Sequence, residues 1–333
     1  MRTQTIRGCR VSLIVAYSMV VLAVPAFGQE RTETPADQPI AGVDASNDSE
    51  SAGPNAGRLS FIPPPPVPTP KAEPGVEPSK IHFNGGVDFT NAYFFRGIMQ
   101  DRGAFIVQPY GSLSLDLYES DSLKVSVNAG MWNSFHDSAV NATATDGFER
   151  NWYEADWSLG INATAGKWTF GAQYVWETSP SGAFGTVQEI DLSITFDDSE
   201  ALGAWKLSPS LLLAIETGSH FADGAGRGIY LQPSISPGFD ADMPLLGKTS
   251  FTFPIVVGLS LSNYYQDSAG HDQTFGYVDI GAKAAFALPV PKTYGAWNVT
   301  LGMHYLALGT HAADLNGGKH GEVIGTIGIA LSF

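Results

Sequence analysis

From residue 81 onward, apolar and polar or small residues alternate along most of the chain. In residues 168–176 a Trp-Phe-Ala-Tyr-Trp series alternates with Thr, Gly, Gln and Val, and residues 123–131 and 297–305 show the same period. A period of two places each series on one face of a β-strand. The pattern therefore predicts an all-β domain whose strands have one apolar and one polar face.

Twelve such runs follow one another, and most are longer than the five or six residues usual in soluble proteins. They suit the roughly 9–11 residues with which a tilted strand crosses a bilayer. An even number of crossings returns both ends of the domain to the same side of the membrane. The predicted strands are residues 81–95, 104–117, 122–136, 151–164, 167–178, 187–197, 204–217, 228–239, 249–264, 274–288, 295–308 and 321–333.

The connections between these runs alternate between short turns and longer polar loops, which is typical of outer-membrane barrels. Lipid requires every backbone polar group to be paired, so the strands are expected to close on themselves. Aromatic residues gather near the ends of the apolar faces, and Tyr93 and Phe95 are expected in the outer girdle. Pro233, Pro237 and Pro254 are expected to weaken the ladder between residues 228 and 264. The fold class predicted is a transmembrane, antiparallel, up-and-down β-barrel of about twelve strands.

The chain divides into three parts. Residues 1–28 carry a positive start, an apolar run and a small-residue cleavage point, which predicts a signal peptide. Residues 29–80 hold 11 of the 21 prolines and no periodicity, so we expect a disordered periplasmic linker, with the cell wall as one candidate partner. Residues 81–333 form the barrel. The alternating last strand ends in Phe333, which resembles the signal read by the barrel-assembly machinery. The expected location is the bacterial outer membrane, with both termini in the periplasm.

Charge excludes one class of partner. From residue 81 onward there are 25 acidic and 11 basic residues, and nucleic-acid binding needs cationic patches. No phosphate-binding loop, hydrolase elbow or zinc-protease motif is present, and no histidine spacing matches an established metal site. We therefore expect no cofactor, no metal and no enzyme activity. One enzymatic alternative is a surface lipase-like site at the neighbours His136 and Ser138, or at Ser219 and His220.

The parity opposite the lipid face is expected to line the lumen, and it is strongly acidic. A water-filled lumen of this kind favours cations, whereas carboxylates paired with lysines and hydroxyls give a closed polar core. The residues predicted to set selectivity are Asp88, Asp116, Lys124, Glu154, Asp156, Glu177, Glu189, Asp191, Glu216, Asp279 and Lys283.

The segment that ends the first strand carries a family resemblance. Tyr93-Phe94-Phe95-Arg96-Gly97-Ile98-Met99-Gln100 resembles the Y-x-F-R-G-[IV]-x-Q segment of a family of bacterial outer-membrane porins of largely unknown function. This chain has Met99 where small hydroxyl residues are usual. The residues themselves predict a strand-to-loop turn at Arg96-Gly97. Arg96 falls on the lumen parity and is expected at the rim, in a salt bridge to Asp88 or another carboxylate. The alternative is that Arg96 forms the cationic side of a constriction.

These features predict a porin-like channel for passive passage of small solutes, with a preference for cations. The alternative is a non-conducting barrel that ties the outer membrane to a periplasmic or cell-wall partner through the Pro-rich segment. A surface enzyme is the third.

Overall fold

The structure, a computed structural model, describes residues 80–333 apart from 139–140, 145–146, 204–205, 225 and 268. The predicted signal peptide, and the predicted linker up to residue 79, lie outside the described residues. All strands named below belong to one antiparallel sheet. They are β1 (Ile81–Phe95), β2 (Ile98–Glu119), β3 (Leu123–His136), β4 (Trp152–Ala165), β5 (Trp168–Thr178), β6 (Val187–Phe196), β7 (Ser210–Glu216), β8 (Ile229–Ile235), β9 (Gly238–Met243), β10 (Gly247–Thr252), β11 (Ile255–Ser262), β12 (Phe275–Ala287), β13 (Ala296–Leu308) and β14 (Gly321–Ser332).

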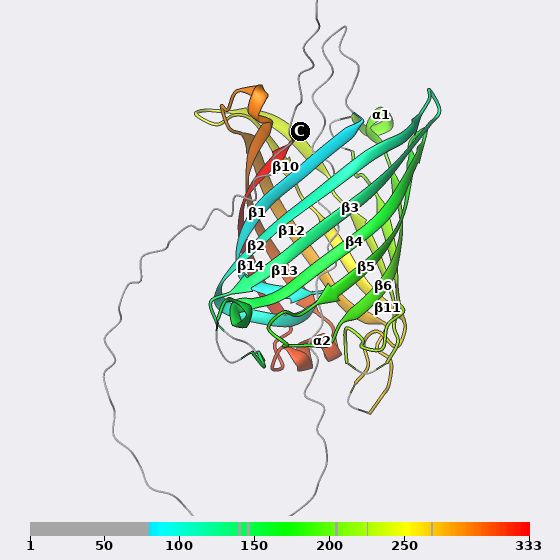
Figure 1. Ribbon diagram of the computed structural model, residues 1–333, viewed down its shortest axis with the longest axis vertical. Coiled ribbons are helices and arrows are strands. Elements are labelled where there is room, and N and C mark those ends of the chain that lie inside the picture. The colour runs from blue at the N-terminus through cyan, green and yellow to red at the C-terminus, as the bar shows by residue number, and fades with distance from the viewer. Residues whose placement is uncertain (1–79, 139–140, 145–146, 204–205, 225, 268) are drawn as a thin grey trace, which may run out of the picture. The chain divides into compact units, whose positions relative to one another are not determined.

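The sheet closes into a barrel (Figure 1) because its first strand pairs with its last, β1 with β14. The segments β8 and β9 together form one wall strand, and β10 and β11 together form the next. Between these two wall strands, β8 pairs with β11 and β9 pairs with β10. On the other side of the second wall strand, β12 pairs with both β10 and β11. Counted in this way, the wall has twelve strands, each antiparallel to both neighbours. This confirms the predicted up-and-down barrel of twelve strands.

The two divided wall strands break at prolines. Pro237 separates β8 from β9, and Pro254 separates β10 from β11. A proline has no N–H to donate to the ladder, which explains a local interruption. Phe253 bridges the gap by donating its N–H to the carbonyl of Pro237, at 2.7 Å. Pro233, also expected to weaken the ladder, remains inside β8 opposite Leu211.

The barrel has two different ends. At the terminal end, Phe83 and Phe333 exchange backbone hydrogen bonds of 3.1 and 2.9 Å, and the connections there include the short helices α1 (Ser199–Leu202) and η3 (Lys292–Tyr294). The opposite end, called the loop end below, carries the longer connections with η1 (Phe148–Asn151) and α2 (Thr310–Leu315). In Figure 1 the C-terminus lies at the top and α2 at the bottom.

The outer face of the barrel is apolar. Along β4, Trp157, Leu159 and Ile161 are 48%, 59% and 46% exposed, whereas Asp156 on the other face is 6% exposed. Similar outward residues occur around the circumference: Leu113, Phe170, Leu192, Leu211, Leu261, Ile280, Leu301 and Ile327. A closed sheet with an apolar outer band and a polar interior is the form in which strands cross a bilayer. The chain is therefore a transmembrane β-barrel of the outer-membrane type.

No helix in the described ranges is long and apolar enough to span a membrane.

Candidate functional site

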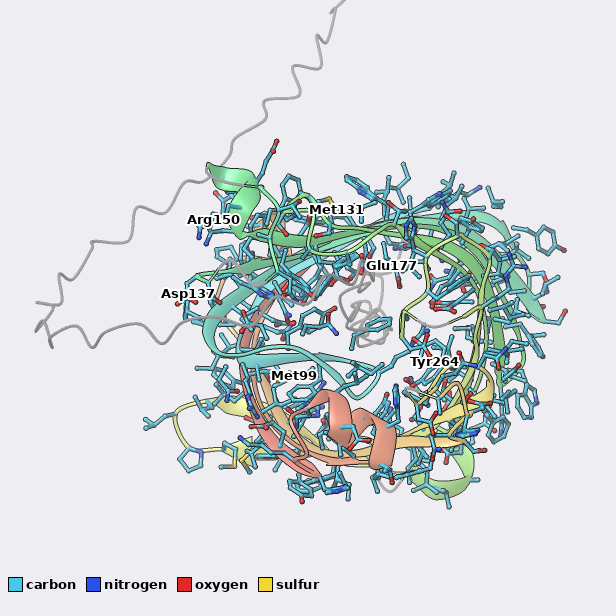
Figure 2. All side chains as sticks on the ribbon, turned by 90° about the horizontal axis from the view of Figure 1, so that it is seen from below. Met99, Met131, Asp137, Arg150, Glu177 and Tyr264 are labelled. Atoms are coloured by element: carbon cyan, nitrogen blue, oxygen red, sulfur yellow. The ribbon has the colours of Figure 1, made fainter. Side chains whose placement is uncertain are left out.

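The tip of the β1–β2 hairpin leaves the wall and crosses the interior. Regular pairing runs from the terminal end to Thr90 and Ile106, where the register shifts. On the β2 side, Gly103 has a φ of +73°, and Phe105 stays on the outer face, 57% exposed. Residues 92–102, called the inner hairpin below, then turn into the lumen, as the cyan ribbon near Met99 shows in Figure 2.

The turn of the inner hairpin places an arginine at its tip. Phe95 pairs with Ile98, and the two residues between them, Arg96 and Gly97, both have positive φ, at +46° and +82°. Two positive values define the type I′ turn, which favours Asn-Gly and similar pairs. An arginine in this conformation carries strain of about 1 kcal/mol or more. Its side-chain contacts offset that strain.

Gly97 fits where a larger residue does not. A Cβ added there would lie 2.7 Å from Cδ1 of Tyr277 on β12.

The Arg96 guanidinium lies in a cage on the far wall. Its Nη1 and Nη2 donate to the two carboxylate oxygens of Glu189 at 2.7 and 2.6 Å, and Nη1 also donates to the hydroxyl of Tyr264 at 2.7 Å. Asp191 is a further 4.0 Å neighbour. The guanidinium carbon lies 4.4 Å from the ring centre of Tyr230 and 5.2 Å from that of Tyr264. This is a bidentate, charge-assisted pair with cation–π contacts.

The prediction that Arg96 lies at the rim is wrong, because Arg96 is 1% exposed. The salt bridge predicted for it is present, but to Glu189 inside the barrel and not to Asp88. The prediction that Tyr93 and Phe95 join the outer girdle is wrong as well, because they are 3% and 1% exposed. Strand alternation assigns faces only while the strand follows the wall, and the bend after Thr90 takes these two residues out of it.

Two tyrosines hold the flanks of the inner hairpin. Tyr93 donates its hydroxyl to Glu154 at 3.1 Å, and Tyr153 on β4 donates to the side-chain oxygen of Gln100 at 2.6 Å. Three of the fixed side chains of the family-like segment, Tyr93, Arg96 and Gln100, thus each contact the wall. The segment that resembles the porin family is the docking element of the hairpin.

A buried chain of contacts from a serine through a histidine to an aspartate lies beside the hairpin. The Nε2 atom of His136 is 2.9 Å from the hydroxyl oxygen of Ser134, and Nδ1 is 3.0 Å from a carboxylate oxygen of Asp101. This is the order of a serine-hydrolase triad. Ser134 is 0% exposed, however, so an ester has no access to its hydroxyl. Asp101 belongs to the inner hairpin, and the chain therefore acts as a further attachment of the hairpin to β3.

The Ser-His neighbours predicted from sequence do not form such a chain. Ser138 donates to Asp101 at 3.0 Å, and the exposed Ser219 and His220 are 3.4 Å apart.

The carboxylates predicted on β4 to β7 gather in the lumen around the hairpin. All six are at most 6% exposed, and they are Glu154, Asp156, Glu177, Glu189, Asp191 and Glu216. Asp156 and Glu177 stand opposite each other on neighbouring strands, and Gln173 donates to Asp191 at 3.1 Å. Glu216 accepts the backbone N–H groups of Ala222 and Gly228, each at 2.6 Å.

A small cavity lies among these acidic groups. It is bordered by Arg96, Trp132, Asp156, Glu177 and Glu189, and it holds about 10 Å³, roughly one water-sized sphere.

The remaining predicted lumen residues lie apart from this group. Asp116 lies 2.9 Å from His82 and 2.7 Å from Lys124. Asp279 lies 3.1 Å from His304. Asp88 lies on β1 opposite Gln108, and Lys283 lies on β12 opposite Gly302. The predicted set is therefore not one ring: six members surround the inner hairpin, and five lie elsewhere on the wall strands.

Comparisons with known proteins add only distant similarities. No family model matches the chain, and no curated protein matches it. LpxR from Salmonella typhimurium is 9% identical with a TM-score of 0.40, covering 74% of this chain and 99% of LpxR. The β-domain of the Bordetella autotransporter BrkA is 12% identical with a TM-score of 0.35, covering 76% and 98%. A porin structure is 11% identical with a TM-score of 0.29, covering 76% and 99%. The strand pairing described above, rather than these values, defines the fold.

Proposed function

We propose that this protein is a bacterial outer-membrane channel for passive passage of small solutes, that it prefers cations, and that the inner hairpin is its constriction. The observation that carries the proposal is the charge around the hairpin. Six buried carboxylates from β4 to β7 surround it, and among the described residues Arg96 is the one Lys or Arg side chain that is buried. Confined charges of one sign focus the field and favour counter-ions.

The hairpin defines a closed state. Phe94, Phe95 and Ile98 are at most 1% exposed, so the hairpin is packed tightly against its surroundings inside the barrel. Passage then requires the hairpin to move so that Arg96 separates from Glu189 and Asp101 separates from His136. Both ends of the hairpin continue into wall strands, so it can move inside the barrel without leaving it. We expect low conductance at rest and higher conductance when these contacts are weakened.

The same tight packing favours one alternative, a non-conducting structural barrel. Single-channel current through the purified full-length protein, in a planar bilayer with a KCl gradient, separates the two. A channel gives steps with a cation-selective reversal potential, and Asp156→Asn together with Asp191→Asn reduces that selectivity. Asp240→Asn is the matched control, since Asp240 is half exposed on β9 and bonds to Lys248 and Ser250. A folded barrel that passes no current, even when Glu189 is changed to Gln, supports the non-conducting structural barrel instead.

The tether alternative has its own test. Deletion of residues 29–80 leaves a channel conducting, whereas a tether loses its attachment to the cell envelope.

The terminal end is assigned to the periplasm in this proposal, with Phe333 as the feature recognised by the barrel-assembly machinery. Phe333 is 57% exposed and pairs with Phe83 at the seam where the barrel closes. No enzyme activity is proposed, because Ser134 is 0% exposed and the aspartate beside His136 comes from the hairpin.

A further inference from the structure

The cage around Arg96 is built almost entirely by the wall. Glu189 and Asp191 come from β6, Tyr230 comes from β8, and Tyr264 follows β11. Of the groups that contact the guanidinium, Phe95 belongs to the hairpin itself, with its ring centre 4.8 Å from the guanidinium carbon. Glu189, Asp191 and Tyr230 stand on wall strands, so these three members of the cage remain in place if the hairpin moves away. The wall therefore carries a preformed receptor for whatever group replaces Arg96.

The chemistry of this receptor selects a planar cation. The two oxygens of Glu189 accept two parallel N–H groups, at 2.7 and 2.6 Å, a geometry that a guanidinium fork matches and an ammonium does not. The Tyr230 ring offers a flat face at 4.4 Å, and the Tyr264 hydroxyl accepts one further N–H at 2.7 Å. Flat, weakly hydrated cations stack well on such rings.

The buried negative charge of Glu189 requires a cation beside it, so a cationic solute can enter the site by replacing Arg96. Withdrawal of Arg96 alone leaves Glu189, which is 0% exposed, without its cation, and an uncompensated buried carboxylate is strongly unfavourable. Exchange of Arg96 for another planar cation keeps the charge of the site constant.

We propose that Glu189, Asp191, Tyr230 and Tyr264 form a binding site for solutes bearing a guanidinium group, and that such solutes replace Arg96 there as they pass the inner hairpin. Solutes with a guanidinium group are therefore the proposed substrate class of the channel. This inference rests on the proposed function of solute passage, although binding itself can be measured without passage.

The test uses the full chain with Arg96→Ala, which empties the cage, and methylguanidinium as the probe. Methylammonium is the control for charge without a planar fork, and urea is the control for a planar group without charge. At about 10 mM, methylguanidinium is expected to raise the unfolding temperature of Arg96→Ala in detergent, because it binds the folded state. The other two compounds should give less than about a third of that shift. The added change Glu189→Gln should remove it.

Current through Arg96→Ala supplies an independent readout. Half-block by methylguanidinium is expected at a concentration roughly tenfold or more below that for methylammonium. A thermal shift without any current keeps the site and overturns passage. Current with equal block by both cations, or with block unchanged by Glu189→Gln, overturns the site and keeps passage. Arg96→Lys is the second variant if Arg96→Ala does not fold, since lysine keeps the charge without the fork.

Discussion

Replacement of Glu189 by Gln should release the inner hairpin. The change keeps the size of the side chain but removes the charge that pairs with Arg96 at 2.6 and 2.7 Å. Both side chains are 1% exposed, so the pair is shielded from solvent. The closed state loses stabilisation, while an open hairpin, with Arg96 in water, loses little.

The size of the effect follows from burial. Loss of one partner of a buried ion pair costs about 3–5 kcal/mol. Asp191, 4.0 Å from the guanidinium, retains part of the attraction, and the amide oxygen of the Glu189→Gln variant still accepts a hydrogen bond. We therefore take the lower end, about 3 kcal/mol, which corresponds to a roughly hundredfold rise in the open population.

Thiol labelling measures that population. Cys9 is the one cysteine of the sequence and lies in the predicted signal peptide, so a single cysteine can be placed at Ile98, which is 0% exposed. In a Cys9→Ser background, the labelling rate of Ile98→Cys by a small charged thiol reagent follows the open fraction when opening and closing are fast. The rate should rise roughly a hundredfold with Glu189→Gln.

Asp116→Asn is the matched control. It also neutralises a buried carboxylate with a lysine partner, Lys124 at 2.7 Å, but that pair lies near the terminal end of the barrel, where Asp116 also contacts His82 of β1. It should leave the labelling rate within about threefold of the parent, since that change is under about 1 kcal/mol. Equal rates in the Glu189→Gln and parent proteins refute the view that this ion pair holds the hairpin.

Three further predictions concern other parts of the barrel. Burial lowers the pKa of His311 below its ordinary 6.5, although the negative charges of Asp314 and Asp267 raise it in part. The opened form of α2 therefore binds a proton more readily than the packed form, and α2 should lose hydrogen-exchange protection as the pH falls below about 6.5. His311→Gln should remove this pH dependence. Leu159→Arg on the lipid face should destabilise the folded barrel in vesicles by about 2–4 kcal/mol, measured by denaturant titration. A loss of stability under about 1 kcal/mol contradicts the placement of Leu159 in the bilayer. Deletion of Phe333 should reduce the folded fraction in outer membranes, seen by heat-modified gel mobility; assembly equal to the full chain argues against its role.

The wall of the barrel is predictable because alternation is a local property of each strand. The parity of Leu159 and Asp156 in the sequence assigns one to the outer face and the other to the inner face of β4. The need to pair every backbone polar group in lipid then requires the strands to close into a barrel. The breaks at Pro237 and Pro254 are also local, since a proline has no N–H to donate to the ladder, although Pro233 shows that one proline can remain within a strand.

The inner hairpin is not predictable in this way. Tyr93 and Phe95 keep the lipid parity in sequence, yet their side chains lie inside, because the register shift after Thr90 bends the hairpin. The partners of Arg96 are more than ninety residues away, and no period links them. One clue was available: an arginine at a turn position that favours asparagine indicates a side chain with a specific role.

The buried arrangement of Ser134, His136 and Asp101 is not predictable from the sequence for a related reason. Ser134 and His136 share a face of β3, but Asp101 reaches them only through the inward bend.

The most direct test of the central claim is single-channel current through the full-length protein across a KCl gradient, compared with the Glu189→Gln variant. A channel held closed by the inner hairpin gives infrequent cation-selective openings in the unmodified protein. The variant gives much longer or more frequent openings, and they remain cation-selective. A correctly folded barrel that passes no current in either form contradicts this claim.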